Sequence, residues 1–308
     1  MRELWTELYR PKTIDGYVFT DVSVKEQVEE WIKDGACPHL LLHGPAGTGK
    51  TTLAKVLVNQ LGIDDYDFLQ VNASRDNGVD FLKNKIEGFV STLPFGHLKI
   101  VLLDEADYLS PNAQGLLRGL METYQAQARF ILTCNMVHKI INPLKSRCAE
   151  LHINKTDQVE FFTRASTVLA TEGVEFEPET LASYVAATYP DLRKCLNLLQ
   201  TNSKDGKLLD PKDIESSSTQ DYKLAMVDLF KRRKIKEARK LLCEQARPEE
   251  MDEIFRWMYD NLDLWSSTDE GQDEAILIIR KGLVNHSLVA DPEINLSATI
   301  TELAGIEK

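Results

Sequence analysis

Four short apolar segments recur along the first half of the chain. They cover residues 38–43 (PHLLLH), 99–103 (KIVLL), 129–133 (RFILT) and 149–153 (AELHI), and the last of them alternates apolar and polar side chains. Between the first two, apolar residues recur at helical spacing over 53–61. Continuous apolar strands separated by helices are typical of a parallel sheet covered on both faces. Such a sheet binds ligands at the carboxyl ends of its strands.

The pattern becomes wholly helical after residue 156. One apolar stripe with spacing i, i+3, i+4, i+7 and i+11 consists of Met251, Ile254, Phe255, Met258 and Leu262. A chain of 308 residues is also too long for one ordinary hydrophobic core. We therefore predict an α/β domain over 1–153, a small helical domain over 154–213 and a second, all-helical domain over 214–308.

The first apolar segment leads into GPAGTGKT, residues 44–51, which fits the pattern GxxxxGK[ST]. Its glycines allow backbone N–H groups to surround phosphates, and the following helix adds its N-terminal dipole. Lys50 is expected to reach the β- and γ-phosphates of a nucleotide, and Thr51 is expected to bind Mg²⁺. The alternative is a glycine-rich turn that binds nothing, which the strand-to-helix context disfavours.

Polar residues follow the next two apolar segments. After KIVLL, Asp104 is expected to hold Mg²⁺ and Glu105 to polarise an attacking water, although both carboxylates could simply cap a helix. After RFILT, Asn135 either orients a water near the γ-phosphate or is an ordinary turn residue. Together with the glycine loop, the two carboxylates predict hydrolysis rather than nucleotide binding alone.

The whole set of motifs has a family pattern. In chain order the motifs are WTELYRPKTIDGYV, GPAGTGKT, VNASRDNGVD, LLDEAD, AQGLLRGLME, LTCN, PLKSRC and YPDLRKCLN. From about Trp5 to about Leu199 they resemble the AAA+ ATPase subunits of sliding-clamp loaders, of the replication factor C small-subunit type. The length and the segment NHSLVADPEINLSATITELA look most like the large ATPase subunit of tailed-phage loaders. The resemblance implies an AAA+ P-loop sheet, a helical lid and a C-terminal helical collar that holds subunits together.

The resemblance also assigns residues that act on ATP. Arg147 of the SRC triplet matches the arginine finger, which acts in trans on ATP bound to the neighbouring subunit. Arg193 matches the cis sensor arginine of the lid; an ordinary surface charge is the alternative for both arginines. The residues expected to bind ATP are Tyr9, Arg10, Pro11, Gly44, Pro45, Ala46, Gly47, Thr48, Gly49, Lys50, Thr51, Thr52 and Arg193. For the first three, which match an N-terminal segment that packs near the nucleotide, a purely structural role is the alternative.

The net charge of −12 argues at first against nucleic acid. Residues 251–308 contain 4 basic and 12 acidic residues, a net of −8, so the first 250 residues carry only −4. Within them, Arg75, Lys83 and Lys85 match the segment that faces duplex DNA in these loaders, although a solvated helix face is the alternative. A few phosphate contacts from each of several subunits suffice for DNA binding.

Two further sets of residues have counterparts in the family. Gln114 and Arg118, four residues apart, match residues that couple neighbouring sites. Val90, Leu93 and Phe95 fall where the family contacts the clamp, and burial in the chain's own core is the alternative.

The sequence therefore predicts the ATP-hydrolysing subunit of a loader that opens the DNA polymerase processivity clamp and places it on primer–template DNA. ATP and Mg²⁺ are the expected cofactors, and DNA and clamp are expected to stimulate hydrolysis. The expected partners are the sliding clamp, primer–template DNA, other copies of the chain and one different loader subunit in a five-subunit ring.

Several classes of protein are excluded or compete with this prediction. The apolar segments fall short of the ~18 residues of a membrane span, and the charged N-terminus is unlike a secretory signal, so we expect a cytoplasmic protein, in the host cytoplasm if it is phage-encoded. Five scattered cysteines without CxxC argue against a disulfide framework and a zinc knuckle. The remaining alternatives are another AAA+ DNA motor, such as a branch-migration helicase, and a non-hydrolysing structural loader subunit.

Overall fold

The computed structural model describes most of the chain. The described residues are 3–75, 78–211, 222–232, 234–245, 251–286, 288–289 and 291–306. They group into two compact units, of which one comprises Glu7–Asp157 and the other comprises Met1–Thr6 together with Gln158–Lys308. None of the described helices is both long and apolar enough to cross a bilayer.

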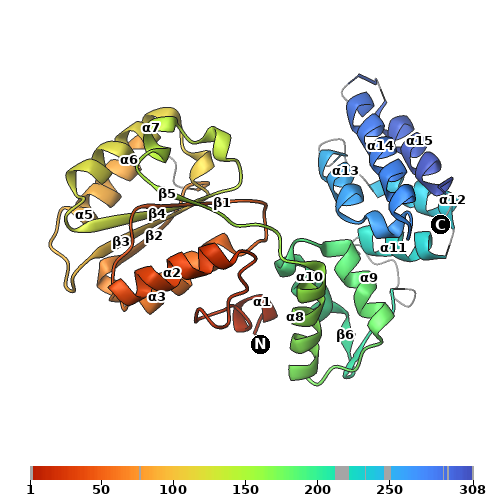
Figure 1. Cartoon of the computed structure of the whole chain (residues 1–308), viewed down its shortest axis with the longest axis horizontal. Coiled ribbons are helices and arrows are strands. Elements are labelled where there is room, and N and C mark those ends of the chain that lie inside the picture. Colours follow the sequence, from red (N-terminus) through yellow and green to blue (C-terminus); the bar gives the residue numbers. More distant parts are fainter. Residues whose placement is uncertain are drawn as a thin grey trace. The chain divides into compact units, whose positions relative to one another are not determined.

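The first unit contains a five-stranded sheet in which all neighbours are parallel (Figure 1). The strand order is β2-β3-β4-β1-β5. The strands are β1 (Leu40–His43), β2 (Phe68–Asn72), β3 (Lys99–Asp104), β4 (Ala128–Cys134) and β5 (Ala149–His152). The four predicted strands are confirmed, and β2 is an additional strand at one edge. Because β1 lies between β4 and β5, the residues that follow β1 and β4 meet at the same edge of the sheet.

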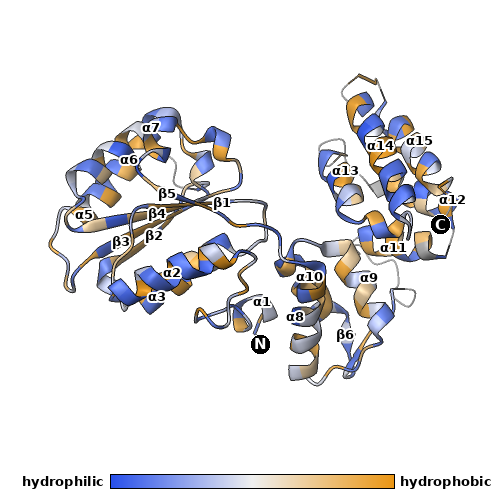
Figure 2. Cartoon of the chain, viewed as in Figure 1, coloured by the Kyte–Doolittle hydropathy of each residue, from blue (hydrophilic) through white to orange (hydrophobic). Residues whose placement is uncertain are grey.

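Helices cover both faces of this sheet. One face is covered by α2 (Val22–Asp34) and α3 (Lys50–Gln60), and the other by α5 (Gly88–Val90), α6 (Pro111–Thr123) and α7 (Asn142–Lys145) (Figure 1). Leu40 and Leu42 pack in the core beneath α2 and α3, whereas Leu41 packs in the opposite core. Figure 2 shows the strands as mainly hydrophobic and the helices as mixed. Burial on both faces explains why the three inner strands, β1, β3 and β4, are continuous apolar segments.

A helical stretch connects β2 to β3. It consists of α4 (Val79–Leu82), a π-helical turn (Lys83–Glu87) and α5. Shorter 3₁₀ turns occupy Asp65–Asp67 before β2, Ala106–Tyr108 after β3 and Val137–Lys139 after β4. π-helical turns are rare and often lie at functional sites, and this one carries two of the lysines predicted to face DNA.

The second unit is almost wholly helical, as predicted. Its helices are α8 (Gln158–Thr171), α9 (Pro178–Thr188), α10 (Leu192–Asn202), α11 (Tyr222–Lys231), α12 (Ile235–Gln245), α13 (Met251–Asp260), α14 (Asp269–His286) and α15 (Pro292–Ala304). A hairpin of two-residue strands, β6 (Ser203–Lys204) and β7 (Lys207–Leu208), was not predicted. The predicted boundary at 213–214 lies outside the described residues and stays a prediction.

The apolar stripe of α13 is buried except at its end. Met251, Ile254, Phe255 and Met258 are buried, but α13 ends at Asp260. Leu262, predicted to continue the stripe, instead begins a 3₁₀ turn (Leu262–Leu264), and its side chain is half-buried. The helical register of the stripe therefore ends earlier than the sequence pattern predicted.

The N-terminus of the chain packs on α10. Here α1 (Trp5–Leu8) begins with Trp5, which is buried and whose backbone N–H donates to Oε1 of Gln200 at 3.0 Å. Nε2 of Gln200 donates in turn to the carbonyl of Glu3 at 2.8 Å. These bonds connect the first residues of the chain to a helix almost 200 positions away, and they explain why the second unit includes the N-terminus.

Candidate active site

The glycine loop joins β1 to α3 at the carboxyl edge of the sheet. Gly44 has φ +151°, and a Cβ atom built there would lie 2.2 Å from the carbonyl oxygen of Ile153, so only glycine fits beside the end of β5. Gly49 occupies the N-cap of α3 in the left-handed region with φ 90°. The loop therefore presents the backbone at the start of α3, where N–H groups and the helix dipole favour an anion.

The side chain of Lys50 is hydrogen-bonded to the glycine loop. Its Nζ donates to the carbonyl of Gly44 at 2.9 Å and to the carbonyl of Pro45 at 2.6 Å. Burial lowers the pKa of Lys50, and the nearby carboxylates of Asp107 and Asp104 oppose that shift. The ammonium group thus lies within the phosphate-binding loop, where phosphate oxygens could replace its carbonyl partners.

Two predicted magnesium ligands are brought together. Oγ1 of Thr51, on α3, donates to Oδ1 of Asp104, at the end of β3, at 2.7 Å. Hydroxyl and carboxylate oxygens are the ligands that Mg²⁺ prefers, and in nucleotide sites it needs few of them because phosphates and water complete its shell. No cluster of three or more His, Cys, Asp or Glu side chains suited to a metal occurs among the described residues. The hydroxyl of Thr51 and the carboxylate of Asp104 therefore fit Mg²⁺ shared with a nucleotide.

Glu105 has a strained backbone directly after β3. It lies in the left-handed region, with φ 59° and ψ 42°, which is costly for a residue with a Cβ atom. Its backbone N–H donates to Oγ1 of Thr133 at 3.1 Å, and the same hydroxyl contacts Oδ1 of Asp104. Thr133 was not predicted, although a hydroxyl inside an apolar strand is a usable signal.

Asn135 follows β4 directly and is exposed at the same edge of the sheet. The next residue, Met136, donates its backbone N–H to Oδ2 of Asp107 at 3.1 Å. Asp107 is buried, and its other oxygen, Oδ1, has no partner among the described residues. Asp107 was also missed by the sequence prediction; its position two residues after Glu105 brings a carboxylate under the turn that carries Asn135.

A shallow hollow, open to solvent, lies beside the glycine loop. Its lining includes Tyr17, Val18, Val24, Thr48 and Ile153. The hydroxyl of Tyr17 donates to the carbonyl of Thr48 at 3.5 Å, which joins this hollow to the loop. Tyr9, Arg10 and Pro11 are not among the described residues that line it; their role in ATP binding stays a prediction, and Arg10 pairs with Glu7 at 2.8 Å.

Known proteins resemble the chain at the level of sequence. A family model described as "ATPase family associated with various cellular activities (AAA)" matches residues 40–156. The "Replication factor C small subunit" of Sulfolobus acidocaldarius is 34% identical over 98% of this chain and 95% of its own length. The chain belongs to the replication factor C small-subunit family. It is therefore an AAA+ ATPase subunit of the clamp-loader type, with a role in DNA replication.

Other relatives agree with this family. The replication factor C small subunit of Thermofilum pendens is 31% identical over 99% of this chain and 98% of its own length. That of Sulfurisphaera tokodaii is 40% identical over 67% of this chain, and the match spans 64% of the relative. Solved structures of Thermotoga maritima RuvB, a "Holliday junction branch migration motor", share 19% identity with TM-scores of 0.57 to 0.58, over 72–73% of this chain and 78–79% of theirs. At that identity they show the AAA+ fold alone.

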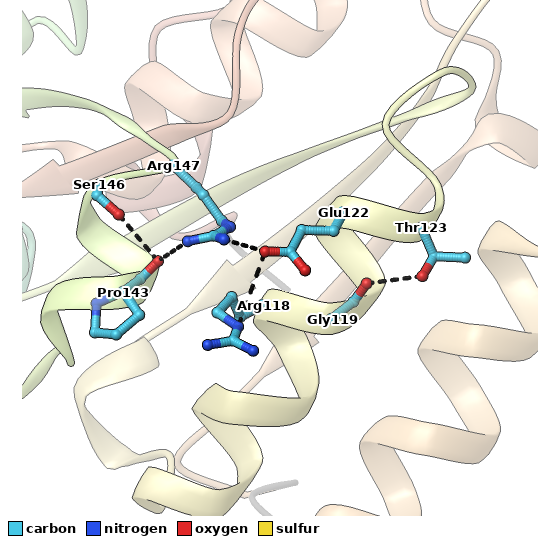
Figure 3. A network of polar contacts seen from close by, with 7 residues as sticks. All are labelled: Arg118, Gly119, Glu122, Thr123, Pro143, Ser146 and Arg147. Carbon is cyan, nitrogen blue, oxygen red and sulfur yellow. Dashed lines mark hydrogen bonds and ion pairs between the residues drawn. The ribbon is translucent and has the colours of Figure 1, made fainter.

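In this clamp-loader subunit, Arg147 contacts residues of α6 and α7 (Figure 3). It follows α7, and its Nη1 donates to the carbonyl of Pro143 at 2.7 Å. Its Nη2 forms an ion pair with Oε1 of Glu122, on α6, and the side chain remains 34% exposed. Its action on a neighbouring subunit stays a prediction. Arg193 lies on the second unit, exposed near the start of α10, and its sensor role also stays a prediction.

The two residues predicted to couple neighbouring sites differ in environment. Gln114 is buried in α6; its Nε2 donates to the carbonyls of Leu109 (3.0 Å) and Lys139 (3.1 Å), and its Oε1 accepts from the N–H of Ile141 at 2.8 Å. Gln114 thus connects α6 to the chain that leads from Asn135 into α7. Arg118 is exposed, with its Nε 4.0 Å from Glu122.

The predicted DNA-facing residues are all exposed. Arg75 lies in the turn after β2, and Lys83 and Lys85 lie in the π-helical turn. Their exposure is compatible with phosphate contacts, and their DNA-binding role stays a prediction.

One of the residues predicted to contact the clamp is buried. Val90 is 0% exposed and packs in the core beneath α5 and α6, so that prediction is wrong: the side chain has no surface to offer a partner. Leu93 and Phe95, by contrast, are 81% and 80% exposed. The ring of Phe95 lies 5.5 Å from that of Tyr66, which is also exposed, so two exposed rings lie together on this surface, two residues along the chain from Leu93.

The loop that carries this apolar group is well braced. The buried carboxylate of Asp67 accepts the backbone N–H groups of Phe95 at 3.0 Å and of Gly96 at 2.7 Å. Nζ of the buried Lys99 donates to the carbonyl of Phe89 at 2.8 Å and also contacts Oγ1 of Thr92. Because these bonds already fix the loop, little conformational entropy would be lost when its exposed apolar side chains bind a partner.

Two stacked histidines border the glycine loop. His43 and His152 end β1 and β5, with ring centroids 4.9 Å apart and ring planes inclined by 18°. Burial lowers the pKa of His43, and the positive charges of His152, Lys145 and Lys50 lower it further, whereas Glu150, 3.9 Å away, raises it. The pKa of His43 therefore lies below the ordinary histidine value in the folded chain.

This arrangement predicts a pH-dependent stability. Below the ordinary histidine pKa of about 6.5, the unfolded chain binds more protons at His43 than the folded chain does, so the free energy of unfolding decreases as the pH falls. We expect His43→Gln to lose less stability than wild type between about pH 7 and pH 5.5, measured by thermal unfolding. His138→Gln, at an exposed turn, is the control, and an equal pH dependence of wild type and His43→Gln would contradict the prediction.

Proposed function

We propose that this subunit hydrolyses ATP in a loader that opens a sliding clamp and places it on primer–template DNA. The observation that carries the proposal is the assembly of Lys50, Thr51, Asp104 and Glu105 at one edge of the sheet, in a unit that also exposes Arg147. An exposed arginine with no contact to its own glycine loop is suited to a site on another subunit. The names of the relatives support the choice of a clamp loader over other motors.

The residues have separate tasks in hydrolysis. Lys50 binds the β- and γ-phosphates, and the N–H groups at the start of α3 bind the remaining phosphate charge. Thr51 and Asp104 would hold Mg²⁺, which neutralises charge on the phosphate oxygens. Glu105 accepts a proton from the attacking water, and Asn135 orients that water. The hollow beside Tyr17 and Val18, which lies next to the glycine loop, is the place on this unit where the base of the nucleotide would lie.

Hydrolysis is coupled to DNA and clamp through assembly. ATP bound between subunits stabilises a spiral in which Arg147 and Arg193 contact the γ-phosphate, and loss of that phosphate removes the contacts and shifts the population to a releasing state. Arg75, Lys83 and Lys85 supply a few phosphate contacts from each subunit in the ring. The partners in this proposal are the clamp, primer–template DNA, further copies of the chain and one different loader subunit, in the cytoplasm.

An ATPase assay of the assembled loader tests this function. We expect clamp and primed DNA together to stimulate turnover more than either alone, with similar stimulation by junctions of unrelated sequence. Unstimulated turnover accompanied by ATP-dependent strand displacement would favour a branch-migration motor. Tight ATP binding by this subunit without any turnover in the complete complex would favour a structural loader subunit.

The exposed loop predicts a clamp-specific defect. We expect Leu93→Glu or Phe95→Glu to weaken clamp binding by about tenfold or more, because a charge replaces an apolar side chain at the centre of the contact. DNA-stimulated turnover without clamp should remain. Val22→Glu is the matched control, since Val22 is exposed on the same unit at the start of α2. Clamp binding that is equally weak in all three variants, or unchanged in both loop variants, would contradict this role.

A further inference from the structure

A single carboxylate is shared by two arginines beside α7 (Figure 3). Oε1 of Glu122 pairs with Nη2 of Arg147, and the same oxygen lies 4.0 Å from Nε of Arg118, one helical turn earlier on α6. Arg118, Glu122 and Arg147 are each partly exposed. Two positive groups and one negative group therefore leave a net positive charge on this surface.

The guanidinium of Arg147 is held by a backbone carbonyl as well as by Glu122. Its Nη1 donates to the carbonyl of Pro143 at 2.7 Å, and Oγ of Ser146 donates to the same carbonyl at 3.2 Å. The helix that carries Pro143 is fixed by Leu144, which is fully buried, and by the bond between Gln114 and the N–H of Ile141. The backbone around Arg147 is thus rigid, and the partner that can most easily be exchanged is Glu122.

The ion pair is suited to exchange. An exposed ion pair changes the equilibrium between its paired and separated states by about fivefold or less, because water already solvates both charges. A triphosphate carries more negative charge than one carboxylate and can bind a guanidinium through two oxygens at once. A phosphate presented by a neighbouring subunit can therefore displace Glu122 from Arg147, while Arg118 keeps Glu122 neutralised.

We propose that Glu122 is a positioning residue that occupies, in the separate subunit, the place on Arg147 that a phosphate of the neighbour's ATP takes on assembly. This inference rests on the proposed function, since it requires Arg147 to act in trans. The carboxylate keeps the arginine directed along α6 and competes with the nucleotide for it. Engagement of Arg147 then depends on a neighbour that carries a triphosphate, and a weaker anion does not displace the carboxylate.

The test is Glu122→Gln in the assembled loader. We expect the ATP concentration for half-maximal turnover to fall about two- to fivefold, because the competing charge is removed, while turnover at saturating ATP stays within about twofold of wild type. Glu29→Gln, which breaks an exposed pair with Lys25 on α2, is the matched control and should leave both quantities unchanged. Lower turnover at saturating ATP, or an unchanged half-saturating concentration, would overturn the proposal.

A second background separates this inference from the proposed function. In Arg147→Ala subunits, Glu122→Gln should have no further effect on half-saturation, because Glu122 acts through Arg147. If Glu122→Gln changes the half-saturating ATP concentration equally in both backgrounds, the proposed role of Glu122 is wrong, but the assignment of Arg147 as the arginine finger still stands. If Arg147→Ala alone leaves turnover unchanged, the finger assignment and this inference are both wrong.

Discussion

Arg147→Ala should lower ATP turnover by the assembled loader about 10³-fold or more, the range by which arginine fingers stimulate phosphoryl transfer. ATP binding by the variant subunit should stay normal, because the guanidinium contacts Pro143 and Glu122 rather than the glycine loop. Steady-state turnover and equilibrium nucleotide binding measure the two effects separately. Lys25→Ala is the control for loss of an exposed cation on the same unit.

Mixed assemblies test whether Arg147 acts in trans. A Lys50→Ala subunit cannot bind phosphate well but still offers Arg147 to its neighbour. An Arg147→Ala subunit can bind ATP but offers no finger. We expect mixtures of the two to regain part of the turnover that each lacks alone, since an intact site forms wherever they meet in the right order. No recovery in mixtures, or impaired ATP binding by the isolated Arg147→Ala subunit, would contradict the trans assignment.

Much of the fold could be predicted because local signals agree with tertiary burial. Three of the four predicted strands, β1, β3 and β4, lie inside the sheet and are largely buried, which is the condition that gives a strand a continuous apolar sequence. The fourth, β5, lies at an edge of the sheet with only Leu151 buried, and it was predicted from its alternating pattern instead. The edge strand β2 escaped prediction since its sequence FLQVN is mostly half-buried, with only Val71 fully buried. An edge strand has one neighbour and a weaker pattern.

The residues of the site also divide into those that local sequence signals predict and those that depend on tertiary neighbours. The residues of the glycine loop and the two acidic residues at the end of β3 could be predicted, because their chemistry requires a fixed spacing. Thr133 and Asp107 could not, because their role depends on which strands are neighbours. Val90 was misassigned for a related reason: an apolar residue near an exposed loop is a surface contact or a core residue depending on the neighbouring helix, and here α6 covers it.

Glu105→Gln should reduce turnover by about 10²- to 10⁴-fold, the usual contribution of a general base. The amide has the same size as the carboxylate and keeps the backbone bond to Thr133, but it cannot take a proton from water. ATP and Mg²⁺ binding should persist, since Lys50, Thr51 and Asp104 are unchanged. The variant loader should therefore hold clamp and DNA in the ATP-bound state without release, which single-turnover kinetics would detect. Turnover above about a tenth of wild type would contradict the assignment of Glu105 as base.

The backbone of Glu105 allows a stricter version of this test. A non-glycine residue in the left-handed region destabilises the folded chain by roughly 1–2 kcal/mol, and glycine removes that strain. Glycine also makes the unfolded chain more flexible, which lowers the free energy of unfolding by about 0.4–1 kcal/mol. Glu105→Gly is therefore expected to melt no lower than wild type while losing turnover to the same degree as Glu105→Gln. A variant that is stable but inactive would show that turnover is lost because the carboxylate is missing and not because the fold is damaged. It would also show that the strained backbone at this position is kept for the position of the carboxylate, at a cost in stability. A large drop in melting temperature would instead show that the side chain supports the fold.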